Sequence, residues 1–423
     1  MRRRFFVLLS MLMCGVLASQ ADAATKAIKF GKLVDGTGRV LTNAIVIVEN
    51  DRITAVTTAA TAVPAGAEII DLSNYTGIPG LIDVHTHMTY GPLPGGNNSP
   101  VVNMFLGQDA LKKTLEAGVT TVRDMNASQY VDIAMRDLIN MGKMVGPRMF
   151  VVGCGLRPTR SAFVPGGVPP ACGVGDGPVE FMRNAREQLA AGADWIKIFG
   201  STGSGQNVTG FQTVTYEEMK AAADVTHNLG HKIAIHSYGP NGARDAVRAG
   251  TDSLEHATDM DDETIAEMVK RKTWYVPTID HNRYYAENGN ILGYDPKSDY
   301  KERLNNFIQR NLETARKAFK AGVRFAMGSD AIYTMFGENA YELGWFVKAG
   351  MTPEQALTTA TSGAALMLGM EKSLGSVAPG FFADIAAVEG DPLKDINVVL
   401  HNVRWVMRSG NVVVDKTKGS KTN

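Results

Sequence analysis

Apolar runs alternate with amphipathic stretches along the chain from about residue 80 onward. Runs rich in β-branched and other apolar residues, typical of buried strands, lie at 81–87, 120–125, 148–153, 195–199, 232–236, 253–256, 274–279 and 324–328. Stretches with helical periodicity separate most of them, for example at 102–116, 177–191, 216–229, 262–270 and 300–321. Many helical stretches end at a glycine, which is favoured just past a helix C-terminus. Strands and crossovers in this alternation predict an α/β fold, a (β/α)8 TIM barrel.

Polar side chains recur at the ends of these predicted strands or inside them. They are His85, His87, Lys197, His236, His256 and Asp330. The C-terminal ends of the strands of a barrel converge on one mouth, where active sites of this fold lie. The alternative fold, a doubly wound open sheet, gives no reason for such a recurrence.

His85 and His87 lie two residues apart on the first strand, in the motif Asp-Val-His-Thr-His at 83–87. Side chains alternate along a strand, so both imidazoles face the same side and suit a divalent metal such as zinc. Each polar residue also has an ordinary explanation by itself. A strand-end histidine often makes surface hydrogen bonds, and an Asp after a strand often caps a helix. Their recurrence in the right strands favours a metal site.

Lys197 interrupts the apolar fourth strand. A buried ammonium is costly unless it is paired, and a buried lysine readily changes its pKa. The side chain could simply extend along the barrel interior until its charged end reaches water.

In chain order, the 83–87 motif, Lys197, His236, His256 and Asp330 resemble the metal-dependent amidohydrolase superfamily, in its binuclear type with a carboxylated lysine. The resemblance implies that His85 and His87 bind one zinc ion and that His236 and His256 bind a second. A carboxylated Lys197 and a hydroxide would bridge the two ions, and Asp330 would touch the first.

The resemblance covers essentially the whole mature chain and implies a small β-sandwich beside the barrel. Residues 375–385 resemble the family's return into that sandwich, and early strands at 27–30, 44–49 and 52–55 would supply its other part. We therefore expect an N-terminal sandwich part at 24–77, a barrel at 78–375 and a C-terminal sandwich part at 376–423.

The implied reaction is hydrolysis of a carbon–nitrogen amide bond. Asp330 would act as general base and then general acid, or serve as a ligand only. Tyr238, two residues after His236, resembles the tyrosine that holds the substrate's free carboxylate in Xaa-Pro dipeptidases and related enzymes, although it could merely pack over a loop. His281, after the seventh strand, would line the mouth and contact substrate, or face solvent. Ochratoxinase-like carboxypeptidases share this frame.

The loop after the third strand departs from the dipeptidase pattern. A Gly- and His-rich segment is expected there, but this chain has Arg-Pro-Thr-Arg at 157–160 and Val-Pro-Gly-Gly at 164–167. The resemblance therefore leaves the acyl-side specificity open. Two other hypotheses remain beside a dipeptidase. One is a mononuclear deaminase or imidazolone-type cyclic amide hydrolase, although such enzymes generally lack the strand-four lysine. The other is an inactive scaffold.

The N-terminus has the pattern of an export signal. Arg2 to Arg4 are followed by an apolar run at 5–17 and by Ala-Asp-Ala at 21–23. This run is too short to span a bilayer, so we expect residues 1–23 to be removed and the product to be periplasmic or secreted. An oxidising compartment permits a disulfide between Cys154 and Cys172, and the sequence leaves that pairing open.

Composition narrows the range of partners. The 43 Lys and Arg residues balance the 43 Asp and Glu residues, and no basic stretch resembles a nucleic-acid footprint. We expect a small-molecule or dipeptide substrate, no nucleic-acid partner, no membrane association after signal removal, and a homo-oligomer.

Overall fold

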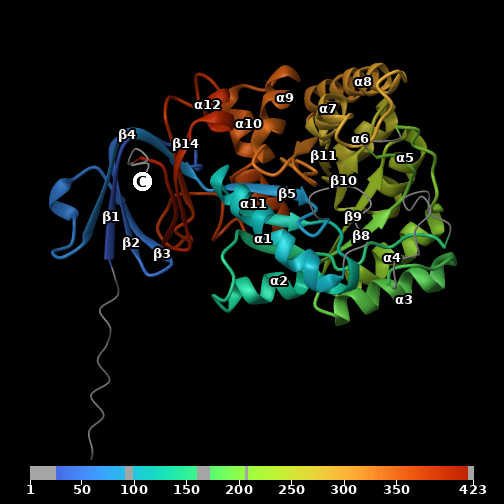
Figure 1. Cartoon of the computed structure of the whole chain (residues 1–423), viewed down its shortest axis with the longest axis horizontal. Helices are drawn as coiled ribbons and strands as arrows, with labels where there is room; N and C mark the ends of the chain where they lie inside the picture. Colours follow the sequence, from blue (N-terminus) through green and yellow to red (C-terminus); the bar gives the residue numbers. More distant parts are fainter. Residues whose placement is uncertain (1–24, 91–98, 160–171, 205–207, 418–423) are drawn as a thin grey trace, which may run out of the picture.

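The computed structural model describes residues 25–90, 99–159, 172–204 and 208–417 (Figure 1). The expected signal peptide at 1–23 lies outside these residues and stays a prediction. Within the described ranges, no helix combines the length and the hydropathy needed to cross a bilayer.

Parallel strands form the centre of the larger part of the molecule, on the right in Figure 1. They are β5 (Leu81–Thr86), β6 (Val119–Asp124), β7 (Arg148–Val151), β8 (Trp195–Phe199), β9 (Lys232–Ser237), β10 (Ser253–His256), β11 (Trp274–Val276) and β12 (Arg324–Phe325). They are assigned to a three-stranded sheet, β5-β6-β7, and a five-stranded sheet, β8 to β12. Single bridges link the two sheets at both seams, Leu156 with Ile198 and Thr86 with Ala331. This arrangement is a TIM-barrel-type α/β fold, as predicted.

Helices follow the strands and cover them on the outside (Figure 1). The helices are α1 (Pro100–Glu116), α2 (Val131–Asn140), α3 (Gly177–Ala190), α4 (Tyr216–Asn228), α5 (Pro240–Ala249), α6 (Asp262–Arg271), α7 (Ile279–Asn288), α8 (Tyr300–Ala321), α9 (Glu342–Lys348), α10 (Pro353–Thr359), α11 (Ser362–Leu368) and α12 (Asn397–His401). Their ends follow local chemistry. Thr215 and Glu218 form a capping box at the start of α4, and Gly322 ends α8 in the left-handed conformation.

The predicted seventh and eighth strands were too long. Strand β11 ends at Val276, and Ile279 already begins α7, because Thr278 turns the chain with a φ of 49°. The carboxylate of Glu342 accepts hydrogen bonds from the backbone N–H groups of Ile279 and Asp280, and so caps this helix. His281 therefore lies in the first turn of a helix rather than in a loop.

The N- and C-terminal segments form one seven-stranded sheet in the order β15-β14-β13-β4-β1-β2-β3. Its strands are β1 (Thr25–Val34), β2 (Val40–Glu49), β3 (Arg52–Thr57), β4 (Glu68–Pro79), β13 (Ile385–Val388), β14 (Val403–Arg408) and β15 (Asn411–Asp415). The sequence analysis did not identify β4, which pairs in parallel with β1 and antiparallel with β13 and so joins the two segments. Phe30, Leu72 and Trp405 are buried in the core of this sheet. Its division into a two-layer sandwich, and the boundaries at 77/78 and 375/376, stay predictions.

A disulfide joins Cys154, just after β7, to Cys172. The two Cα atoms are 5.8 Å apart, within the range that disulfides span. The bond ties together the residues on either side of segment 160–171, which lies outside the described part of the chain.

Candidate active site

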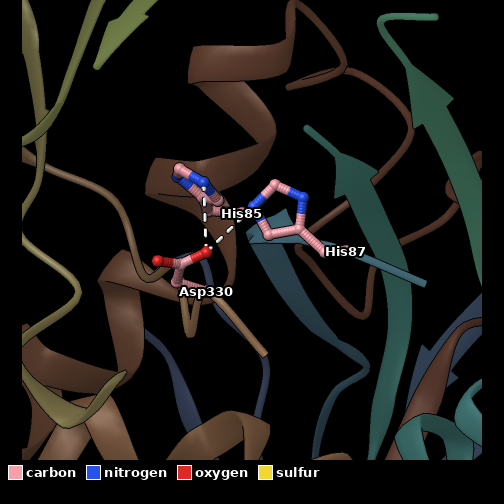
Figure 2. Close-up of side chains that lie close together, drawn as sticks. All are labelled: His85, His87 and Asp330. Carbon is pink, nitrogen blue, oxygen red and sulfur yellow. Dashed lines mark ion pairs between the residues drawn. The ribbon is translucent and has the colours of Figure 1, made fainter. Parts of the chain in front are cut away.

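Three buried side chains from two strand ends converge at the mouth of the barrel (Figure 2). His85 lies on β5, His87 follows it, and Asp330 comes after β12. Asp330 Oδ1 is 3.0 Å from His87 Nε2 and 3.5 Å from His85 Nε2. The three potential ligand atoms all lie within 4.8 Å of one another. Nitrogen and carboxylate ligands at this spacing can hold a divalent metal.

The other predicted ligands adjoin this group. The ring of His256, at the end of β10, is centred 5.0 Å from the ring of His85 and 4.4 Å from that of His236 on β9. Lys197 on β8 is 1 % exposed, and its Nζ makes no hydrogen bond with the described residues. Burial is the main cause of the lowered pKa values of all four histidines, and a positive charge on Lys197 lowers them further. The structure thus places all six predicted ligands together.

Burial keeps the four imidazoles neutral. It lowers the pKa of His87 and holds the pKa values of His85, His236 and His256 well below 6.5. A low-dielectric environment disfavours the imidazolium, and nearby positive charges add to that effect. Neutral imidazole is the form that binds metal, because its ring keeps a free lone pair.

The two charged groups of the site respond in opposite ways to burial. Burial lowers the pKa of Lys197 to about 8, although Glu255 and Asp330 act to raise it. Burial by itself would raise the pKa of Asp330, but His281 and a hydrogen bond from His87 hold it well below 3.8. Asp330 is therefore an anion, and the amine of Lys197 loses its proton far more readily than an exposed lysine.

The backbone is unusual where it carries the site. His256 and Asp330 have φ values of 71° and 53°, in the left-handed region that non-glycine residues rarely adopt. Nearby, a Cβ at Gly328 would lie 2.5 Å from Val276 Cγ1 and 2.8 Å from His85 Cβ, so only glycine fits there. Such strain concentrates where a side chain must be aimed at a functional centre.

Glu255 and Arg123 orient the first histidine. The Nδ1–H of His85 donates to Glu255 Oε2 at 2.7 Å, because a carboxylate can only accept. Arg123 donates to Glu255 Oε1 at 2.8 Å, and all three side chains are fully buried. This fixes the His85 tautomer with its Nε2 lone pair facing Asp330, the arrangement common behind metal-binding histidines.

Asp83 joins the two strand ends that carry the first three ligands. Its carboxylate accepts hydrogen bonds from the backbone N–H groups of His85 (3.1 Å) and Ser329 (2.9 Å), from the Ser329 hydroxyl, and from Asn339. Burial raises its pKa to about 6 against these hydrogen bonds. His256 is also held through its Nδ1, as His85 is, because this atom lies 2.6 Å from Thr278 Oγ1.

Tyr238 and His281, the predicted substrate contacts, both line this site. His281 donates from Nδ1 to the carbonyl oxygen of Asp330 at 2.8 Å, and its Nε2 is 3.3 Å from Asp330 Oδ2. The ring of Tyr238 lies 5.0 Å from that of Phe307 and 5.1 Å from that of His256. Its buried hydroxyl makes no hydrogen bond with a described residue, and burial raises the pKa of this hydroxyl well above 10.

Sequence reasoning missed the supporting residues. Glu255 and Arg123 lie inside short apolar strands. A charged residue in such a strand is the one feature of the sequence that could have indicated their role. Thr278 carries no such signal, because its contact with His256 depends on the turn between β11 and α7.

The donor set fits a divalent metal. The Nε2 of His85 and the Nζ of Lys197 are buried and lack a hydrogen-bond partner among the described residues, and such orphaned atoms are otherwise costly. His85, His87 and Asp330 would hold one ion. His236 and His256, with Lys197 beside them, are the candidates for a second.

A model of the amidohydrolase family matches residues 76–413, most of the chain. The chain belongs to the amidohydrolase family. It is therefore a hydrolase that acts on amide bonds, and its family is typically metal-dependent.

Three comparisons place this amidohydrolase among its relatives. Ochratoxinase from Aspergillus niger is 29% identical over 418 residues, covering 90% of this chain and 85% of that protein. A crystal structure of a Xaa-Pro dipeptidase with bound methionine is 31% identical, with a TM-score of 0.83, over 92% of this chain and 99% of that one. Imidazolonepropionase from Kosmotoga olearia matches more weakly, at 22% identity over 83% of this chain and 86% of that protein.

We predict that Glu255→Gln weakens metal binding. Replacing the carboxylate removes the charge that holds the His85 tautomer, and such partners typically contribute 10–100-fold in affinity, so a loss of about that size is expected. Competition with a chromophoric zinc chelator measures the change. Glu263→Gln is the matched control, since Glu263 is exposed and pairs with Arg248. Equal zinc affinity in the two variants would contradict the proposed tautomer control.

Proposed function

We propose that this amidohydrolase is an exported binuclear zinc enzyme that hydrolyses dipeptides or N-acyl amino acids with a free C-terminal carboxylate. Phenylalanine amides of the ochratoxin type fall within this class. One observation carries the proposal most directly: the buried Lys197, without a hydrogen-bond partner among the described residues, lies beside four neutral histidines and an ionised Asp330. The likeness to an ochratoxinase and to a Xaa-Pro dipeptidase supports the substrate class.

Lys197 supports the binuclear assignment because its environment does not suit an ammonium. Burial favours the neutral amine, and the charges of Arg123 and Arg157 favour it further. The neutral amine can add CO2 and release one N–H proton to solvent, and so become a carbamate anion that offers two oxygen ligands. The oxygens of this carbamate would be available to metal ions held by the two histidine pairs.

The side chains divide the work of amide hydrolysis. Metal ions at this site would polarise the scissile carbonyl and acidify the attacking water. Asp330 Oδ2 accepts the proton of that water and returns it to the leaving amine, as a general base and then a general acid. His281, 3.3 Å from Asp330 Oδ2, holds the substrate or its tetrahedral intermediate over the carboxylate. The unpartnered hydroxyl of Tyr238 donates to the substrate's carboxylate.

The alternative is a mononuclear deaminase or an imidazolone-type cyclic amide hydrolase. The weaker match to imidazolonepropionases favours it. Lys197 argues against it, because a single metal held by His85, His87 and Asp330 gives no role to a buried lysine next to a second pair of histidines.

One prediction of this function concerns the reaction itself. The zinc-loaded protein should release free amino acids from a panel of dipeptides and N-acyl amino acids, detected with ninhydrin. The same preparation stripped with a chelator is the control and should be inactive until zinc is restored. Opening of an imidazolone ring without any release of amino acids would instead establish the alternative.

A second prediction concerns the metal. The active protein should contain about two equivalents of zinc, because two ions are needed to use both histidine pairs. Lys197→Ala should lose activity and regain part of it when zinc and a short carboxylate are added. Lys232→Ala is the control. Lys232 is the first residue of β9, at the end of that strand away from His236, and it donates to the carbonyl of Met367. Full activity with a single equivalent would rule out the binuclear centre.

A third prediction concerns Asp330. Asp330→Asn keeps the shape of the side chain but cannot carry the proton, so kcat should fall by about 10²–10⁴, the scale of general acid–base catalysis. Zinc content must be measured alongside, to separate proton transfer from metal loss. Asp252→Asn, at the far end of the strands and paired with His227, should leave kcat unchanged. Near-normal turnover by zinc-replete Asp330→Asn would place the proton shuttle elsewhere.

A further inference from the structure

Arg157 is a buried cation at the mouth of the barrel. It follows β7, next to Leu156, which bridges to Ile198 of β8. The residue is 6 % exposed, and its guanidinium carbon lies 4.4 Å from the centre of the Phe199 ring. Arginine stacks on aromatic faces in this way while its N–H groups stay available in the plane of the guanidinium.

No carboxylate among the described residues pairs with this guanidinium. Arg157 donates to Asn126 Oδ1 at 3.0 Å and to the carbonyl of Gly155 at 3.3 Å, both neutral acceptors. The internal segments outside the described residues, 91–98, 160–171 and 205–207, contain no Asp or Glu, so they cannot supply one. Arg123, the other buried arginine among the described residues, has Glu255 at 2.8 Å. A buried charge without a counterion is costly.

The guanidinium adjoins the reaction centre. The guanidinium carbon of Arg157 and the Nζ of Lys197 lie over the same Phe199 ring, at 4.4 Å and 5.2 Å from its centre. Asn126, which accepts from Arg157, donates to the hydroxyl of Tyr90 at 2.9 Å. The ring of Tyr90 in turn stacks on His87 with 4.4 Å between centroids. Arg157 is therefore connected to the candidate metal ligands from two sides.

The backbone of Arg157 is held on both sides. Its N–H donates to the carbonyl of Gly173 at 2.9 Å, and its carbonyl accepts from the N–H of Gly175 at 3.1 Å. The disulfide between Cys154 and Cys172 closes the same strand-like pairing. A cation fixed in advance loses little conformational entropy when it binds an anion.

We propose that Arg157 binds the substrate's free carboxylate, and that it is the residue that makes this enzyme selective for acids over their amides. The inference rests on the proposed function, which it deepens by naming the group that supplies the countercharge. The Nη1 of Arg157 has no partner in the described part of the chain, and a planar guanidinium can hold a carboxylate through two parallel N–H···O bonds. Tyr238 supplies a neutral hydrogen bond but no charge.

The test compares an acid with its amide, both as ligand and as substrate. Binding of N-acetyl-L-phenylalanine and of N-acetyl-L-phenylalaninamide is measured by calorimetry, and kcat/KM by amino acid release, for the zinc-loaded wild type and variants. Arg157→Met should weaken binding of the acid by roughly 10²-fold, the scale for truncating one partner of a buried charge pair. It should change binding of the amide by less than about threefold, since no charge pair is lost.

Two further variants sharpen the comparison. Arg157→Lys keeps the positive charge but loses the planar pair of N–H donors. The ratio of acid affinity to amide affinity should therefore fall by roughly tenfold. This variant also tests the proposal if Arg157→Met does not fold, because an unchanged preference for the acid over the amide in Arg157→Lys overturns it. Arg136→Met is the matched control: Arg136 lies on α2 and already pairs with Asp194 at 3.1 Å, so its loss should leave the preference intact.

The outcomes separate this inference from the proposed function. A preference for the acid that disappears in Arg157→Met, without turnover of either compound, supports Arg157 as the carboxylate site and overturns the proposed reaction. Turnover with the same acid preference in wild type and Arg157→Met overturns the role of Arg157 alone. A parallel loss for both ligands with a fall in bound zinc also overturns it, because Arg157 would then support the metal centre.

Discussion

Removal of water from the ends of the parallel strands is the constraint on which the site depends. Four imidazoles, an ammonium and a carboxylate lie together where each would be costly to keep charged and unpaired. The histidines respond by staying neutral, and the pKa of Lys197 falls to about 8 because of the same burial. Asp330 is held as an anion by His281 and by the hydrogen bond from His87. A cluster of neutral nitrogen ligands around one carboxylate is the state that a divalent cation stabilises.

The supporting residues make this burial tolerable. Glu255 accepts from both His85 and Arg123, and Asp83 accepts from the backbone on both sides of the seam between β5 and the segment after β12. Each carboxylate is thereby satisfied by several donors, as a buried charge requires. The same bonds aim the His85 ring and fix the register of the two strand ends. The same hydrogen bonds therefore stabilise the barrel mouth and orient the candidate ligands.

Arg157 differs from Arg123 in the one respect that matters for recognition. Both guanidinium groups are buried and both stack on an aromatic ring, Phe199 and Trp195 respectively. Only Arg123 has a carboxylate partner within the described residues. Arg123 is a structural charge. Arg157 is held in place by Asn126 and by the pairing beside the disulfide, with part of its hydrogen-bonding capacity unused.

The sequence alone determined the alternation of strands and helices, the barrel-type fold, the family and the six candidate ligands. Period-two and helical patterns are local, and a motif such as Asp-Val-His-Thr-His needs only one strand to be recognised. Strand β8 and helix α8 even match the expected limits. The sequence could not place β4 in the sheet, end β11 at Val276, or pair Cys154 with Cys172. It also gave no role to Glu255 or to Arg157. Each of these depends on contacts between residues far apart in the chain, such as His85 with Glu255, 170 positions later. Only the folded chain decides which buried charge meets a partner and which is left for a ligand, because desolvation is a property of the assembled core.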